Sequence, residues 1–295
     1  MVTRQSIVVT GANGQLGTEL KALAGSYPYY RFIFVGREEL DITNPVAVAD
    51  FFRASSPSYC INCAAYTAVD KAESEPVPAF EVNSRATEIL AIASKENHAH
   101  FLHISTDYVF DGTASSPYTE TAKTNPVSVY GQSKLEGEQK ALSANPETLI
   151  IRTAWVYSRF GKNFVKTMLR LMKEKPEIGV VSDQVGSPTY AADIATAIMT
   201  IVSSGNWFPG IYHFSNQGII SWYEFATAIR EISGSHCLVK PITTAGYPTP
   251  AKRPAYSVLD SEKIASTYQV PLRNWEQSLR DCLQRIAAEE RVQDQ

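Results

Sequence analysis

The sequence has no long hydrophobic run, no leader-like start and no excess of positive charge. No apolar stretch reaches the roughly 20 residues needed to span a bilayer, so we expect no membrane partner. Apolar residues 7–9 follow the first few residues directly, without the pattern of a secretory signal. The formal net charge of -3 argues against a nucleic-acid partner. We therefore expect a cytoplasmic protein.

Cysteine is also scarce, with Cys60, Cys63, Cys237 and Cys282 in the whole chain. The first two form a C-x-x-C, which can indicate metal binding or redox chemistry. They fall in an expected strand, however, where residues three apart point to opposite faces, and no second pair exists. We therefore predict buried structural thiols in a reducing compartment. No cluster of His, Cys and carboxylate residues predicts a metal site.

What the chain does contain is a regular alternation of strand and helix patterns over its first half. This alternation predicts an α/β protein with a Rossmann-type, doubly wound parallel sheet and helices on both faces. Ligands of such sheets bind beyond the carboxyl ends of the strands. The expected strands are 6–10, 31–36, 59–63, 101–105 and 148–152, and the expected helices are 15–24, 45–54, 75–97 and 128–143.

The alternation weakens after Tyr157, which predicts a second unit. Residues 161–164 begin an amphipathic pattern, and Ser221 and Glu224 form a capping box that opens another helix. We predict a dinucleotide-binding domain over 1–157, rejoined by about 190–215. A smaller α/β substrate-binding lobe is expected from 158–189 and 216–287. The active cleft should lie between the two.

A glycine turn follows the first expected strand and precedes the first expected helix. Gly11, Gly14 and Gly17 have the spacing G-x-x-G-x-x-G. Glycine suits this place because a pyrophosphate must touch backbone N–H groups, and a Cβ would hold it off. The helix N-terminus adds partial positive charge. The context predicts a dinucleotide site; the alternative is a glycine-rich turn without a ligand.

The end of the second expected strand bears on the choice of cofactor. An acidic residue there would bind the ribose 2′-hydroxyl of NAD, whereas an arginine suits a 2′-phosphate. Arg37 occupies this place and favours NADPH, with NADH left open; a solvated arginine is the alternative. Farther on, Asp41 could meet the adenine amino group and Ile42 could cover its ring.

Tyr130 and Lys134 lie four residues apart in an expected helix, so they share one face. The lysine charge should favour the phenolate and lower the tyrosine pKa from about 10 toward neutrality. Such a tyrosine can exchange a proton with a carbonyl oxygen. Thr106, after the fourth strand, can hydrogen-bond the same oxygen. About one Tyr-x-x-x-Lys spacing is expected by chance in a chain of this composition. The order along the chain of the glycine turn, Thr106 and this pair is therefore stronger evidence than the spacing itself. His103 alternates with apolar residues and predicts a core histidine.

Together these motifs resemble the extended short-chain dehydrogenase/reductase superfamily and, more narrowly, the dTDP-4-dehydrorhamnose reductase family. The resemblance covers about residues 6–280 and includes the stretches 105–110, 152–157, 64–75, 163–169, 183–189 and 247–254. It implies NADPH- or NADH-dependent reduction of the C4 keto group of dTDP-4-dehydro-L-rhamnose. The product, dTDP-L-rhamnose, is a precursor of cell-surface polysaccharide.

The resemblance also implies roles for individual residues. Tyr130 would protonate the keto oxygen, Lys134 would orient the nicotinamide ribose, and Thr106 would help to hold the keto group. Substrate contacts would come from Thr106, Asp107 and Trp155, although Trp155 could also be a core residue. Cofactor contacts would come from Gly11, Gly14, Gln15, Leu16, Gly17, Arg37, Asp41, Ile42, Ala64, Ala65, Tyr66, Thr67 and Ile104, together with Tyr130 and Lys134.

A sugar nucleotide carries two phosphates, so the smaller lobe should present a cation. Arg253, in a proline-rich run, is the candidate because arginine pairs with phosphate oxygens through two donors; the alternative is a surface arginine. Two other functions stay open: another nucleotide-sugar reductase or epimerase, and a non-catalytic subunit similar to the methionine adenosyltransferase beta subunit. Intact Thr106, Tyr130 and Lys134 argue against the second. The expected partner is a dTDP-sugar, and a homodimer is compatible with the sequence.

Overall fold

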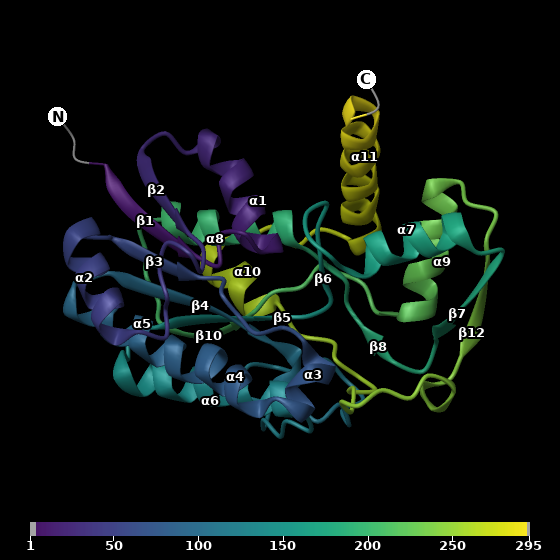
Figure 1. Ribbon diagram of the computed structural model, residues 1–295, viewed down its shortest axis with the longest axis horizontal. Helices are drawn as coiled ribbons and strands as arrows, with labels where there is room; N and C mark the ends of the chain where they lie inside the picture. The colour runs from purple at the N-terminus through teal and green to yellow at the C-terminus, as the bar shows by residue number, and fades with distance from the viewer. Residues whose placement is uncertain (1–3, 294–295) are drawn as a thin grey trace.

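The computed structural model describes residues 4–293, which are organised around a six-stranded parallel sheet with the strand order β10-β5-β4-β3-β1-β2 (Figure 1). The predicted Rossmann-type fold is therefore confirmed. The order reverses next to β1, which is the position where sheets of this kind bind ligands. The strands are β1 (Gln5–Thr10), β2 (Tyr30–Val35), β3 (Tyr59–Asn62), β4 (His100–Thr106), β5 (Leu149–Thr153) and β10 (Gly210–His213).

Helices cover both faces of this sheet (Figure 1). Ile7 and Val9 of β1 belong to the core on one face, and Val8 belongs to the core on the other. All three are fully buried, because successive strand residues point to opposite faces and each face meets helices. The first face packs against α1 (Gln15–Leu23) and α8 (Ala191–Ser203), and the second against α2 (Pro45–Ser55), α5 (Ala86–Glu96) and α6 (Val129–Ala144).

The helix expected over 75–97 is interrupted by a wider turn. The structure has α4 (Pro76–Phe80), a π-helical turn (Glu81–Arg85) and then α5. The turn contains the buried Asn83, which donates hydrogen bonds to the Tyr66 carbonyl at 3.1 Å and to Ser133 Oγ at 3.0 Å. Wider turns of this kind often occur at functional sites, and here the turn holds the loop that follows β3.

A second group of elements packs around its own apolar cluster, which includes Val165, Phe225 and Val239. Helices α7 and α9 cover the two-stranded parallel sheet of β7 and β12 (Figure 1). The capping box at the start of α9 is confirmed, with Ser221 and Glu224 each bonding the other's backbone N–H. The bounds are α7 (Phe164–Glu174), β7 (Glu177–Val181), α9 (Trp222–Ser233) and β12 (Leu238–Ile242).

Several shorter elements and one long terminal helix were not expected from the sequence. The terminal helix, α11, continues to Gln293. Within residues 4–293, no helix combines the length and the apolar character needed to cross a membrane. The remaining elements are η1 (Ala24–Ser26), α3 (Val69–Ser74), η3 (Asp107–Val109), β6 (Val156–Tyr157), β8 (Val185–Gly186), β9 (Thr189–Tyr190), β11 (Ile220–Ser221), η4 (Thr244–Gly246), α10 (Glu262–Tyr268) and α11 (Trp275–Gln293).

Candidate active site

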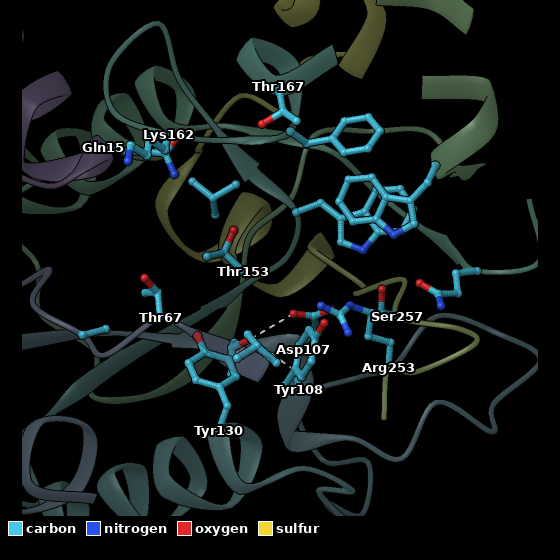
Figure 2. Close-up of a pocket in the computed structure, with 18 of the residues that line it drawn as sticks. Gln15, Thr67, Asp107, Tyr108, Tyr130, Thr153, Lys162, Thr167, Arg253 and Ser257 are labelled. Atoms are coloured by element: carbon cyan, nitrogen blue, oxygen red, sulfur yellow. Dashed lines mark hydrogen bonds between the residues drawn. The ribbon is translucent and has the colours of Figure 1, made fainter. Parts of the chain in front are cut away.

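A cavity of about 880 Å³ lies at the carboxyl ends of the sheet strands. Figure 2 shows Gln15 and Lys162 at one end, Asp107, Arg253 and Ser257 together at the other, and Tyr130 between them. The residues that line the cavity come from both groups of elements. The residues proposed from the sequence that line it are Gly14, Gln15, Leu16, Ala65, Thr67, Ile104, Thr106, Asp107, Tyr130, Lys134, Trp155 and Arg253.

The glycine turn has two distinct functions. Gly11 and Gly17 permit close packing, since a Cβ on Gly11 would lie 2.5 Å from Ala64 N and one on Gly17 would lie 2.4 Å from Gly11 O. Gly14 is the N-cap of α1, has extended backbone and provides no side-chain cap. The N–H groups of the first helical turn therefore remain available to an anion. Backbone of this kind beside the cavity fits a pyrophosphate.

The loop after β3 forms one wall. Its Ala65 and Thr67 line the cavity, while Tyr66 packs against the apolar cluster of Ala72, Ala79 and Tyr130. The loop is held at Tyr66, whose N–H donates to Asn83 Oδ1 at 2.8 Å, and at Ala64, whose N–H donates to Asn62 Oδ1 at 3.1 Å. Small side chains supported from behind leave room for a flat ligand.

Three residues expected at the adenosine end do not line the cavity. Arg37 is exposed beyond the end of β2. The Asp41 carboxylate closes a turn by accepting hydrogen bonds from the N–H and the hydroxyl of Thr43 at 3.0 and 2.7 Å. Ile42 packs against the core on the second sheet face. Roles for these residues in cofactor binding remain a prediction.

A carboxylate that the sequence reading overlooked lies at the same strand end. Glu39 Oε2 accepts the N–H of Gly36 at 2.7 Å. A carboxylate at this place suits the 2′-hydroxyl of NADH, whereas the neighbouring Arg37 suits the 2′-phosphate of NADPH. Glu39 stands only two residues after Arg37, so the sequence contained the information needed to propose it.

Tyr130 and Lys134 both lie on α6 and face the cavity, with only 9% and 1% of their surfaces exposed. The lysine amine contacts β4. Its Nζ donates to the Ile104 carbonyl at 2.7 Å and lies 3.1 Å from His103 Nε2. His103 is buried as expected, but it contacts the proposed catalytic lysine, which the alternation pattern did not reveal.

The expected lowering of the tyrosine pKa is wrong for this structure. Burial raises the pKa of Tyr130 to about 12, and the nearby Asp107 adds to the rise while a hydrogen bond with Thr106 opposes it. Burial also lowers the pKa of Lys134 to about 8. Desolvation disfavours the charged form of each group, and four-residue spacing says nothing about burial. Tyr130 therefore stays protonated at neutral pH, which suits a proton donor.

Asp107 follows β4 and is buried. Its Oδ1 accepts the Thr106 hydroxyl at 2.9 Å (Figure 2), and its Oδ2 has no hydrogen-bond partner among the described residues. Burial raises the pKa of this carboxyl to about 6, although Thr106 and the neighbouring Ser257 act to lower it. The second oxygen of Asp107 is therefore buried beside the cavity and unpaired among the described residues.

This burial predicts a stability effect of Asp107→Asn. Burial favours the protonated Asp107 carboxyl, so this group contributes its full share to the free energy of unfolding below its ordinary pKa of 3.8. That contribution is lost as the pH rises through about 6 and the buried carboxyl becomes charged. Removing the charge should therefore raise the free energy of unfolding by about 1 to 3 kcal/mol at a pH of about 8 and leave it nearly unchanged at about pH 4. Urea unfolding at both pH values measures this difference.

Asp111→Asn is the matched control, because hydrogen bonds from Thr113 and Asn125 lower the pKa of the half-buried Asp111 to about 2. This control should not stabilise the protein at high pH. A loss of stability in Asp107→Asn at about pH 8 would contradict the explanation from burial.

An aromatic wall lies on the side of α7 and α9. Trp155 has a φ of 49°, which is rare for a bulky residue. Its ring stacks on Trp222 with centroids 3.5 Å apart, and Phe164 packs on Trp222 at 4.6 Å. A Cβ on Gly186 would lie 2.5 Å from the Trp155 ring. Trp155 therefore belongs to the cavity wall, together with Trp222, for which the sequence analysis proposed no role.

Arg253 lines the cavity but already has a partner. Its Nη1 and Nη2 donate to Asp70 Oδ1 and Oδ2 at 3.0 and 2.8 Å. The Ala251 N–H also donates to Asp70 Oδ1, at 3.2 Å, and these contacts lower the pKa of the Asp70 carboxyl. The sequence did not predict this pair. An anion bound here would share the guanidinium with Asp70.

Lys162 and Cys63 also line the cavity. Lys162 stands beside Gln15 (Figure 2), where Asn163 Nδ2 donates to Gln15 Oε1 at 2.9 Å. Cys60 is a buried free thiol as predicted, but Cys63 is only partly buried and faces the cavity. Among residues 4–293, no three His, Cys, Asp or Glu side chains are grouped to hold a metal ion.

The parallel sheet, the glycine turn at a helix N-terminus and the Tyr-x-x-x-Lys pair in the cleft are the features of a short-chain dehydrogenase/reductase. A family model narrows this class, since it matches residues 5–288. The chain belongs to the family described as the RmlD substrate binding domain.

Individual relatives agree with this assignment. The chain is 47% identical to a dTDP-4-dehydrorhamnose reductase of Sinorhizobium fredii, over 93% of this chain and 95% of the relative. It is 40% identical to a probable dTDP-4,6-dihydroxy-2-methyloxan-3-one 4-ketoreductase of Streptomyces antibioticus, over 96% of both chains. A crystal structure of dTDP-4-dehydrorhamnose reductase from Bacillus anthracis in complex with NADP superposes with a TM-score of 0.92 at 37% identity, over 95% of this chain and 99% of that one.

Proposed function

We propose that the protein reduces the C4 keto group of dTDP-4-dehydro-L-rhamnose to a hydroxyl, giving dTDP-L-rhamnose, with NADPH or NADH as the hydride source. The observation that carries this proposal is the cavity itself. It joins the uncapped N-terminus of α1, the protonated Tyr130 and the Asp107 carboxyl group. The names of the relatives support the substrate class.

The chain's own residues would act as follows. The bound cofactor supplies hydride, and the first turn of α1 holds its pyrophosphate. The Tyr130 O–H bond breaks as its proton passes to the sugar C4 oxygen, so full negative charge does not build up on that oxygen. Thr106 positions the oxygen, and Asp107 binds a neighbouring sugar hydroxyl. The high pKa of Tyr130 keeps this proton available at neutral pH.

In this proposal the two groups of elements divide the ligands between them. Residues 1–157, together with about 190–215, would hold the cofactor, and 158–189 with 216–287 would hold the sugar nucleotide. The separate apolar clusters of the two groups support such a division. Arg253 and the Trp155–Trp222 stack would meet the nucleotide part of the substrate. The homodimer also remains a prediction, which light scattering of the purified chain would test.

The test follows oxidation of NADPH and of NADH with dTDP-4-dehydro-L-rhamnose, beside a panel of other keto-sugar nucleotides. We expect one dinucleotide to be oxidised for each sugar reduced, and the highest kcat/KM with the rhamnose precursor. A higher kcat/KM with another dTDP-4-keto sugar would move the assignment to a related ketoreductase. Conversion of the sugar without net oxidation of NADPH or NADH would indicate an epimerase. Absence of any sugar conversion would indicate a non-catalytic subunit.

A further inference from the structure

Lys162 is a cation of the cavity wall to which the proposed mechanism assigns no role. Among the described residues, the cationic side chains that line the cavity are Lys134, Lys162 and Arg253. Arg253 is paired with Asp70, and Lys134 is buried and donates to the Ile104 carbonyl. Lys162 is exposed and forms no ion pair or side-chain hydrogen bond within residues 4–293. Its charge is therefore available to a ligand in the cavity.

The two residues beside Lys162 in the chain both contact Gln15, the first residue of α1. Asn163 Nδ2 donates to Gln15 Oε1 at 2.9 Å. Gly161 has a φ of 67°, and a Cβ on it would lie 3.2 Å from Gln15 Cγ. Contacts on both sides therefore hold Lys162 beside the first turn of α1, at the same end of the cavity as Gln15 (Figure 2).

A second contact fixes the loop that carries Lys162, residues 158–163, one turn farther along α1. The Ser158 hydroxyl donates to Glu19 Oε1 at 2.6 Å and accepts the Phe160 N–H at 3.0 Å. Gln15 and Glu19 are four residues apart, so they share one face of the helix. Within the loop, Asn163 Nδ2 also donates to the Ser158 carbonyl at 2.6 Å. The loop is thus joined to α1 at two successive turns.

The charge at this end of the cavity suits an anion with more than one negative charge. The first turn of α1, which has no side-chain cap, contributes roughly half a positive charge. A pyrophosphate that links two nucleosides carries two negative charges, so the helix alone leaves most of this charge unbalanced. A lysine ammonium binds phosphate oxygens as a compact point charge. Asp107, the carboxylate among the described lining residues, lies at the other end of the cavity (Figure 2).

We propose that Lys162 binds the pyrophosphate of the dinucleotide cofactor together with the first turn of α1. The inference deepens the proposed function and rests on its placement of the cofactor. It also makes one exception to the proposed division of the ligands, because Lys162 belongs to the residues 158–189 that were assigned to the sugar nucleotide. A bound cofactor then contacts both parts of the chain.

The test measures ligand binding by the full-length protein in the absence of turnover. Lys162→Gln removes the charge at an exposed position and keeps a polar side chain. We expect the Kd of NADPH and that of NADH, both followed by fluorescence, to rise alike by about 5- to 50-fold, because the two cofactors share the pyrophosphate. ADP-ribose has the pyrophosphate but no nicotinamide, so its Kd, measured by displacement of NADPH, should rise by the same factor. The Kd of dTDP, measured by calorimetry, should not change.

Two matched variants separate the charge at this position from the charge of the whole protein. Lys162→Arg keeps the cation and should retain most of the affinity for NADPH. Lys173→Gln removes an exposed lysine of α7 that does not line the cavity and whose Nζ lies 3.3 Å from Glu290. This control should leave every Kd unchanged, and an equal rise of its NADPH Kd would contradict the inference.

The remaining outcomes distinguish this inference from the proposed function. A loss of affinity confined to NADPH would place Lys162 at the 2′-phosphate, and a loss confined to dTDP would place it at the substrate; each would overturn the inference. Unchanged binding of both cofactors in Lys162→Gln, with binding by the wild type, would overturn it and leave the proposed function intact. Failure of the wild-type protein to bind any dinucleotide would overturn the proposed function and this inference together.

Discussion

Replacing Tyr130 with phenylalanine should lower kcat about 100- to 10,000-fold, because it removes the group that donates the proton to the sugar oxygen. The fold should persist, since the ring still packs edge-on against Tyr108, with centroids 5.5 Å apart. Cofactor binding should change little, because the first turn of α1, which would hold the pyrophosphate, is unaltered. Steady-state kinetics and fluorescence titration with NADPH separate these two effects.

Tyr30→Phe is the control for this experiment. Its hydroxyl bonds the Val202 carbonyl at 3.3 Å on the far side of the sheet, so kcat should stay near that of the wild type. If Tyr130→Phe retained most of its activity on the best substrate, another group would be the proton donor. A parallel loss of NADPH binding would instead indicate a disturbed site.

The second large effect is expected at a buried ion pair behind Lys134. Glu138 on α6 and Arg152 on β5 are only 2% and 3% exposed, and the guanidinium lies over the Phe110 ring at 5.2 Å. Glu138→Gln keeps the shape but leaves the arginine charge buried and unpaired. We expect the free energy of unfolding to fall by about 3 to 5 kcal/mol, measured by urea denaturation.

The same helix provides a matched control. Glu136 forms an exposed pair with Lys140 at 2.8 Å, so Glu136→Gln should cost about 0 to 1 kcal/mol. The double variant Glu138→Leu/Arg152→Met removes both charges and should recover most of the lost stability. Equal losses at positions 136 and 138 would refute the argument that burial decides the size of the effect.

The elements around the glycine turn were predictable because they follow local rules. The strand that ends before Gly11 is apolar on both faces because helices cover both faces of the sheet. The capping box at Ser221 and Glu224 is a pattern of three-residue spacing that bonds its own backbone. The π-helical turn at Asn83 was not predictable in this way, because it serves a loop that lies 17 residues earlier in the chain.

The contacts within the site were less accessible to sequence reasoning. Asp70 and Arg253 are 183 residues apart, and no local spacing connects them. Trp155 was proposed as a substrate contact with the core as the alternative, and only its stacking on Trp222 places it in the cavity wall. The preference for NADPH was predicted from Arg37, although Glu39 bonds the backbone at the same strand end.

The sequence by itself determined the α/β class, the glycine turn and the presence of Tyr130 and Lys134 on one helix, because periodicity and short spacings encode local backbone geometry. Only the tertiary structure decided the protonation of those two residues. Their pKa values depend on desolvation and on neighbours such as Asp107, which the packing of distant segments brings together. Local spacing places a side chain on a helix face, and the folded environment determines which protons it carries.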